Sequence, residues 1–248
     1  RDGKVMAQRV FSDLEIKSKG FLTNVSPEDS QMQSGVLLTA DYNSDLYADA
    51  LFDALNIPCP SNISRAVPKR KTDYLAGRAI SHAAMTTLGV QAQAITTAPS
   101  RAPVWPDGLT GSISHARGRC ACLLSQNTSK SVGIDTEAIA QGKSLAAILS
   151  ETLTEKDRVT ITQGPLPPSV NATLAFSAKE ALFKALYPQV GHYFGFTAAE
   201  LTDPPADHRL VLTLTADLTP HLTKGQSFTC HFRITETHVL TWLSVPTP

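Results

Sequence analysis

The sequence predicts an α+β fold, because helical and antiparallel-strand patterns occupy different stretches of the chain. Residues 71–88 and 171–186 carry apolar side chains at helical spacing. Residues 209–215, 227–235 and 238–245 alternate apolar with polar side chains, which is typical of antiparallel strands with one solvated face. A Rossmann-type parallel sheet is not indicated, since the sequence has no glycine-rich phosphate loop.

The remaining elements are predicted from shorter patterns. Residues 47–55 have helical spacing, and the helix at 71–88 is expected to stop before Gly89. Residues 111–125 and 131–137 are interpreted as two short strands on either side of a polar turn.

Loops and caps complete this outline. Asn171 is the candidate cap of the second long helix. Proline fixes φ and removes a backbone donor, so three proline-rich stretches are expected to be loops: 98–111, 163–169 and 203–206.

Composition restricts the possible partners. The 248 residues include 22 basic and 22 acidic side chains, so no overall field attracts nucleic acid or an anionic membrane. No apolar run approaches the ~20 residues of a membrane-spanning helix. Any anionic substrate therefore has to meet a local cationic cluster.

The cysteine spacings and the N-terminal residues indicate in which cellular compartment the protein acts. The cysteine spacings suit no zinc site, and buried free thiols are the simplest interpretation. This favours a cytoplasmic protein. The chain begins with Arg1 and shows no signal-peptide core, so the cytoplasmic interpretation depends on nothing having been trimmed upstream.

The segment SVGIDTE places two acids on one side of a short strand. Alternation puts Gly133, Asp135 and Glu137 on one face. Two neighbouring carboxylates repel each other unless a cation lies between them, and a hard divalent ion is the obvious candidate. The alternative is an ordinary solvated strand end, which this segment alone does not exclude.

The segment FSAKEALFK places Glu180 and Lys184 one helical turn apart, with Lys179 beside them. Taken alone, such a pair is most often a weak surface ion pair. In an active site, Glu180 would join Asp135 and Glu137 in a magnesium site, and Lys184 would reach a phosphate oxygen.

Two further features are candidates for phosphate binding. His115 ends the segment GSISH, where a histidine is more often structural than a ligand contact. A basic cluster precedes it, although it could equally be a solvated helix start. Its members are Lys69, Arg70, Lys71 and Arg78.

The order of these blocks resembles the 4'-phosphopantetheinyl transferases. V-G-I-D-x-E followed by F-S-A-K-E-A-x-x-K is similar to the family signature. The blocks W-P-x-G-x-x-G-S-I-S-H and K-R-K-x-x-Y-L-A-G-R resemble the enterobactin-type branch. Together they run in family order from Lys69 to Lys184.

The resemblance implies two similar αβ halves related by a pseudo-twofold axis, each with a small antiparallel sheet and a long helix. The halves would be residues 1–128 and 129–248, with coenzyme A in the cleft between them. The second half would carry the magnesium ligands Asp135, Glu137 and Glu180.

The resemblance also implies a donor site and a reaction. Lys184 would contact the pyrophosphate, and Ser114 and His115 would bind the nucleotide end, His115 near the 3'-phosphate. The carrier serine would attack the β-phosphate and release 3',5'-ADP, with Glu180 as the hypothetical general base. The other expected coenzyme A contacts are Lys69, Arg70, Lys71, Arg78 and Lys179.

The expected partners are apo carrier proteins or carrier domains of peptide, polyketide or fatty-acid synthases. The enterobactin-type branch suggests siderophore synthesis, and a monomer is expected from two halves in one chain. Residues 143–158 carry an apolar stripe that would dock the carrier unless it packs into the core, which is the commoner arrangement.

Two rival functions use the same residues. One is a magnesium-dependent hydrolase or transferase that acts on another nucleotide pyrophosphate. The other is a carrier-binding scaffold without activity, against which the three neighbouring carboxylates argue. Release of 3',5'-ADP only in the presence of an apo carrier separates transfer from both.

Overall fold

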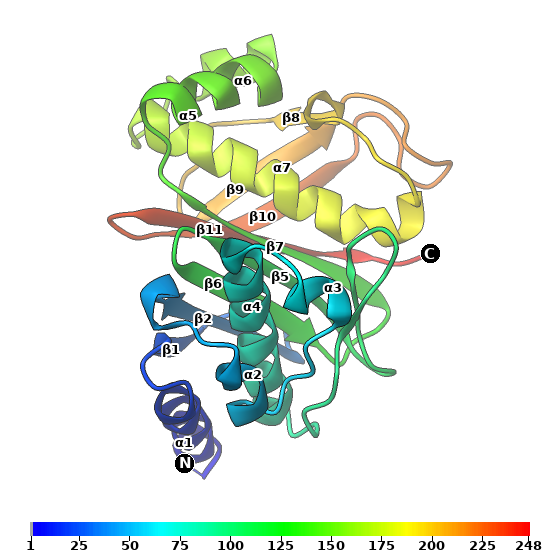
Figure 1. The fold of residues 1–248 in the computed structure, drawn as a ribbon. Coiled ribbons are helices and arrows are strands. Elements are labelled where there is room, and N and C mark those ends of the chain that lie inside the picture. The colour runs from blue at the N-terminus through cyan, green and yellow to red at the C-terminus, as the bar shows by residue number, and fades with distance from the viewer. Residues whose placement is uncertain (1) are drawn as a thin grey trace. The chain divides into compact units, whose positions relative to one another are not determined.

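The computed structural model describes residues 2–248 and contains two compact units, Arg1–Thr128 and Ser129–Pro248. Each unit has an antiparallel sheet with a long helix packed on it (Figure 1). The α+β prediction is confirmed. Each unit also has its own buried apolar cluster.

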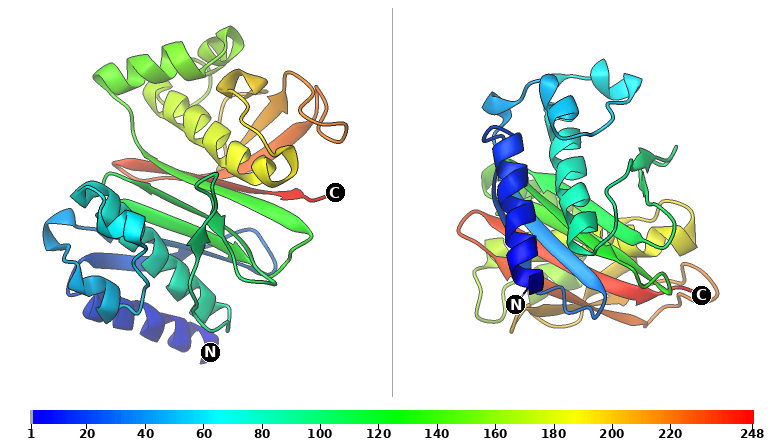
Figure 2. Two further views of the ribbon diagram at one scale, coloured as in Figure 1. Left: turned by 45° about the vertical axis from the view of Figure 1, so that its right-hand side comes forward. Right: turned by 90° about the horizontal axis from the view of Figure 1, so that it is seen from below.

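The first unit is built on a four-stranded sheet in the order β1-β2-β6-β5, with a separate pair β3-β4. Helix α4 contacts β2, β5 and β6, and helix α1 lies beside α4 and β1 (Figure 2). The elements are α1 (Asp2–Lys17), β1 (Leu22–Glu28), β2 (Gly35–Tyr42), η1 (Ser44–Leu46), α2 (Ala50–Ala54), α3 (Ser61–Ser64), α4 (Pro68–Thr87), β3 (Thr96–Thr97), β4 (Pro103–Val104), β5 (Thr110–Ala116) and β6 (Arg119–Ser125).

The second unit is built on a five-stranded sheet in the order β7-β11-β10-β9-β8, against which helix α7 packs through β7 and β11. The alternating pattern correctly predicted the last three strands. The elements are β7 (Lys130–Ala138), α5 (Gly142–Ala147), η2 (Ile148–Thr152), α6 (Glu155–Thr160), α7 (Pro168–Val190), η3 (Phe196–Ala198), β8 (Ala199–Leu201), β9 (Arg209–Leu214), β10 (Ser227–Ile234) and β11 (His238–Pro246).

The two long helices begin and end where local chemistry allows it. Pro68 and Pro168 are their first residues, a position where the missing N–H costs nothing. Gly89 and Gly191 follow their last turns with φ of +76°, a conformation that glycine adopts without strain. The predicted helices at 71–88 and 171–186 are therefore confirmed, and the stop at Gly89 is correct.

The interpretation of residues 111–125 as one strand is wrong. They form most of the hairpin β5-β6, which turns at Arg117 and Gly118 with φ of 43° and 81°. Two consecutive positive φ values give the tight turn that suits a hairpin. The polar residues 126–130 therefore connect strands of two different sheets.

Three smaller predictions also need correction. The helix expected at 47–55 is reduced to α2, after the short turn η1. Asn171 does not cap α7, because the helix has already begun at Pro168. Its Nδ2 instead donates to the carbonyl of Ile161 at 3.0 Å. Three cysteines are buried free thiols as expected, but Cys59 is exposed.

The apolar stripe of residues 143–158 packs into the core. The segment that carries it is divided into α5, the π-helical turn η2 and α6. Ile148 and Leu153 are 8% and 3% exposed, and Leu145 and Leu149 pack against the same cluster. This stripe is not available as a docking surface. Within residues 2–248, no helix has the length and apolarity to cross a bilayer.

Strand β7 and helix α7 approach each other unusually closely. A Cβ on Gly133 would overlap the carbonyl of Ala181 and would lie 2.9 Å from the Ala185 nitrogen. Two residues earlier, the Ser131 hydroxyl donates to the Ala185 carbonyl. This position in β7 therefore requires glycine, and the contact holds the helix directly over the strand.

Replacing Gly133 with alanine should destabilise the second unit. The added methyl group forces α7 away from β7, and overpacking of this kind costs about 1–3 kcal/mol of unfolding free energy. Gly195→Ala is the matched control, because no atom lies within 4 Å of the position that its methyl group would take and its φ is negative. Urea denaturation measures both. Equal midpoints for the two variants would refute the close-approach argument.

Candidate active site

Three predicted acids and one lysine lie together where β7 meets α7. Asp135 and Glu137 come from the strand, and Glu180 and Lys184 come from the helix. The Lys184 ammonium lies 3.2 Å from Asp135 Oδ1 and donates to the Ile134 carbonyl at 2.8 Å. The Asp135 side chain is 5% exposed and that of Lys184 is 30% exposed. The lysine therefore bridges the helix to the acidic strand.

The carboxylates are near enough to affect one another's charge. The pKa of Glu137 is raised to about 8, mainly by burial and then by the charges of Asp135 and Glu180, while Lys184 opposes the shift. Burial also raises the pKa of Glu180, with a second contribution from Asp135 and the same opposition from Lys184. The three acids thus form one partly desolvated group whose charges affect one another, with the Lys184 ammonium beside it.

The donor set fits a hard divalent cation. Carboxylate oxygens are preferred magnesium ligands, and a cation would relieve the repulsion that raises these pKa values. As the side chains stand in residues 2–248, no group of three His, Cys, Asp or Glu residues is gathered closely enough to hold a metal. The three carboxylates are therefore neighbours rather than a closed coordination site, and side-chain rotation would be needed to complete one.

The predicted basic cluster of the first unit borders a cavity of about 350 Å³. Arg70 and Arg78 from α4 and His115 from β5 line it, together with Lys69 and Arg101. Arg101 was not predicted, because it lies in a proline-rich loop far from the basic run. A second cavity of about 570 Å³ shares several of these residues and extends along α4 towards His82.

Asp73 organises one side of this cavity. Its carboxylate accepts hydrogen bonds from Tyr42 at 2.8 Å and Lys69 at 2.7 Å, and His115 Nδ1 lies 3.7 Å away. Burial and this carboxylate raise the pKa of the Tyr42 phenol. Asp73 was missed from sequence, since an acid inside a basic run gives no sign that it holds several donors.

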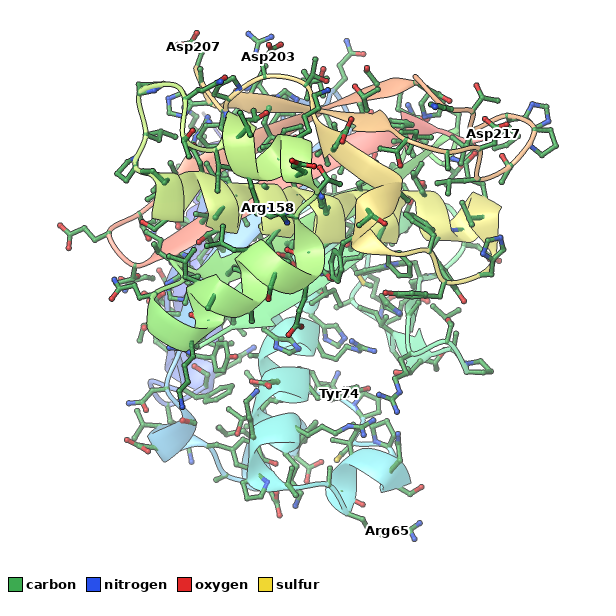
Figure 3. The ribbon with its side chains drawn as sticks, turned by 90° about the horizontal axis from the view of Figure 1, so that it is seen from above. Arg65, Tyr74, Arg158, Asp203, Asp207 and Asp217 are labelled. Atoms are coloured by element: carbon green, nitrogen blue, oxygen red, sulfur yellow. The ribbon has the colours of Figure 1, made fainter. Side chains whose placement is uncertain are left out.

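Arg78 is fixed before any ligand binds. Its guanidinium lies 4.5 Å from the ring centre of Tyr74, which projects from α4 (Figure 3). Its Nε and Nη2 donate to the Ile95 carbonyl and to Thr97 Oγ1, both at 3.1 Å. Burial lowers the pKa of Arg78. The arginine therefore ties α4 to the β3 segment and presents its remaining surface to both cavities.

Three predicted contacts do not line these cavities. Lys71 points to Asp49, with 3.4 Å between Nζ and Oδ1. Ser114 is buried on the face of β5 opposite to His115, because successive strand residues alternate. Lys179 is buried and paired with Asp157 at 2.5 Å. Lys71 and Ser114 therefore lie outside both cavities, whereas Lys179 lines the third cavity, which is described next.

An aromatic cavity beside Glu180 was not predicted. It has a volume of about 130 Å³. Phe183 packs on Phe194 with 4.9 Å between ring centres, and Phe196 packs on Phe176 at 5.5 Å. The repeated aromatics of residues 193–196 were the available signal. The lining comprises Lys179, Glu180, Leu182, Phe183, Tyr193, Phe194, Gly195, Phe196 and Ala199.

Comparison with known proteins matches both units. Residues 60–125 match the 4'-phosphopantetheinyl transferase N-terminal domain, and residues 131–241 match the 4'-phosphopantetheinyl transferase superfamily.

Named relatives are similar over about two thirds of the chain. "Enterobactin synthase component D" of Salmonella typhi is 34% identical over 63% of this chain and 64% of its own length. "4'-phosphopantetheinyl transferase Svp" of Streptomyces mobaraensis is 32% identical over 64% and 67%. "4'-phosphopantetheinyl transferase PptT" of Mycobacterium tuberculosis is 30% identical over 67% and 75%. The chain spans slightly less than two thirds of the length of the enterobactin synthase relatives.

The raised pKa of Glu137 predicts a pH-dependent stability difference. The folded state holds this proton more tightly than the unfolded state, whose ordinary value is 4.5, so ionisation disfavours the fold as pH rises from 4.5 to about 8. Glu137→Gln removes this effect. Without metal, the variant should gain stability relative to the parent across that window and match it below pH 4.5. Urea denaturation in the presence of EDTA measures the unfolding free energy of both proteins at each pH. A difference between them that does not change with pH would contradict a raised pKa of Glu137.

Proposed function

Because the chain belongs to the 4'-phosphopantetheinyl transferase superfamily, we propose that it moves the 4'-phosphopantetheine group of coenzyme A onto a serine of an apo carrier protein. The second product would be 3',5'-ADP. The observation that carries the proposal is the group of Asp135, Glu137 and Glu180 beside Lys184 at the β7-α7 contact. A phosphoryl transfer needs this combination of oxygen donors and positive charge.

Asp135, Glu137 and Glu180 would hold the magnesium ion. When bound, magnesium supplies positive charge that offsets the negative charge of the pyrophosphate. Lys184 supplies a further positive charge from the helix side, since its ammonium already lies at the edge of the acidic group. Glu180 is our candidate for accepting the proton of the carrier serine, because its raised pKa brings a carboxylate nearer to neutral pH.

The cavity of the first unit would bind the nucleotide end of coenzyme A. Arg70, Arg101 and His115 offer several donors to a phosphate, and guanidinium groups match phosphate geometry in a bidentate fashion. Asp73 keeps His115 and Lys69 at this side of the cavity. Their arrangement supports placing the 3'-phosphate here.

The aromatic cavity would bind the pantetheine arm. The arm is an uncharged chain attached to the β-phosphate, so it needs an apolar channel that begins beside the phosphate-binding groups. Glu180 lines the cavity and Phe183 lies one turn further along α7. Apolar walls with a few polar groups at one end are typical of small-molecule sites.

The physiological context follows the named relatives. Similarity to enterobactin synthase component D favours a carrier of siderophore synthesis, and peptide, polyketide and fatty-acid carriers are the alternatives. We propose a monomer that acts in the cytoplasm, free or beside a synthase complex. With the apolar stripe of residues 143–158 packed in the core, the carrier would have to bind through other side chains.

The acids should be required for transfer. Asp135→Asn and Glu180→Gln should each lower kcat/KM by about 100-fold or more, because each removes a metal ligand and Glu180→Gln also removes the base. Asp203→Asn is the control, since Asp203 is an exposed loop acid of the same unit (Figure 3). Intact mass spectrometry of apo carriers incubated with coenzyme A and magnesium measures transfer.

Three outcomes would contradict parts of this assignment. Near-normal turnover of Glu180→Gln at saturating magnesium would remove Glu180 as the base. Hydrolysis of coenzyme A at the same rate with and without a carrier would favour the hydrolase alternative. A carrier left unmodified by the parent protein would refute the transferase proposal.

Two adjacent basic residues should differ in their effect on nucleotide binding. Arg70→Ala should weaken the binding of 3',5'-ADP about tenfold, because Arg70 lines the cavity and would lose a charge-assisted contact. Lys71→Ala should change it less than twofold, since its ammonium pairs with Asp49 outside the cavity. Isothermal titration calorimetry tests both. An equal loss in the two variants would point to a general charge effect.

A further inference from the structure

The mechanism proposed above does not use the buried ion pair between Lys179 and Asp157. Their side chains are 2% and 0% exposed, and 2.5 Å separates Nζ from Oδ2. The lysine also donates to the Thr152 carbonyl at 2.9 Å. Burial lowers the pKa of Lys179 and the Asp157 charge opposes this shift. Burying two charges carries a large desolvation cost, so the pair is expected to have a role other than stabilising the fold.

Asp157 joins several segments around the pair. Its Oδ1 accepts from the Leu201 amide at 2.7 Å, and its Oδ2 accepts from the Thr154 amide at 3.0 Å. The Thr154 hydroxyl completes the capping box at the start of α6. The carboxylate therefore links α6, strand β8 and, through Lys179, helix α7.

These links connect the two sides of the aromatic cavity. One side is α7, where Lys179, Glu180 and Phe183 line the cavity. The other side is residues 193–199, which end at the start of β8. Leu201, held by Asp157, lies two residues after Ala199. One path between the walls therefore runs through Lys179, Asp157 and the Leu201 amide. It adds to the direct ring contacts of Phe183 with Phe194 and of Phe176 with Phe196.

We propose that Lys179 and Asp157 are positioning residues that set the width of the aromatic cavity and thereby the affinity for the pantetheine arm. The proposal rests on the proposed function, because it assigns the cavity to that arm. Neither residue needs to touch the reacting atoms. Loss of the pair would weaken the attachment of residues 193–199 to α7, which the ring contacts alone would then hold, and would reduce the affinity for the arm. The nucleotide contacts of the first unit would be unchanged.

The test compares two ligands that differ in the arm. Coenzyme A carries it, whereas adenosine 3'-phosphate 5'-diphosphate keeps the nucleotide and pyrophosphate and lacks it. Calorimetric Kd values with magnesium are measured for the parent, Asp157→Asn and the double variant Asp157→Leu with Lys179→Met. The double variant leaves no unpaired buried charge, so it guards against loss of folding in the single variant.

We expect the parent to bind coenzyme A more tightly than the truncated nucleotide. The variants should bind coenzyme A at least tenfold more weakly and the truncated nucleotide within twofold of the parent. Lys156→Met is the matched control, because it removes the nearby pair of the exposed Lys156 with the half-buried Glu200 (3.5 Å) and should leave both Kd values unchanged.

Two results would overturn the positioning role. One is a folded double variant with parental affinity for coenzyme A. The other is an equal loss for both ligands, which would indicate general destabilisation. A parent protein that binds coenzyme A no better than the truncated nucleotide would instead refute the assignment of the cavity to the arm, and the positioning role would fall with it.

Discussion

The contact between β7 and α7 at Gly133 is the constraint on which the candidate active site depends. Only a residue without a side chain lets the strand lie against the Ala181 carbonyl. At that separation, the strand acids Asp135 and Glu137 come within electrostatic reach of Glu180, and Lys184 reaches back to the strand. Two sequence blocks far apart in the chain thus become one chemical group, because a missing methyl group permits the approach.

Charge is sorted locally in a chain that is neutral overall. The first unit gathers arginines around a cavity in which Asp73 holds a lysine, a tyrosine and a histidine side chain in place. The second unit gathers carboxylates at the close contact of β7 with α7. A polyanionic donor would meet the arginines of the first unit, and a divalent cation would meet neighbouring carboxylates that turn towards it on binding.

The sequence predicted the elements that have a regular period or a distinct terminal residue. Both long helices, the three last strands and the sharing of one strand face by Asp135 and Glu137 followed from such patterns. The side-chain roles that the sequence could not predict depend on contacts between residues far apart in the chain. Lys71 and Arg70 are adjacent and alike, and only the position of Asp49 separates their roles. The ion pair of Lys179 with Asp157 could not be predicted, because 22 residues separate the partners and no sequence pattern pairs them. The hairpin at Gly118 was missed because its turn is only two residues long.

We propose that three acids from a strand and a helix share one cation. Anomalous diffraction from crystals grown with manganese and coenzyme A can test this, because manganese replaces magnesium at oxygen sites and its anomalous signal distinguishes it from water. We expect a single strong peak within coordination distance of Asp135, Glu137 and Glu180, next to the pyrophosphate. A well-ordered pyrophosphate with the metal bound elsewhere, or with these carboxylates turned away from it, would show that the three acids do not share a cation.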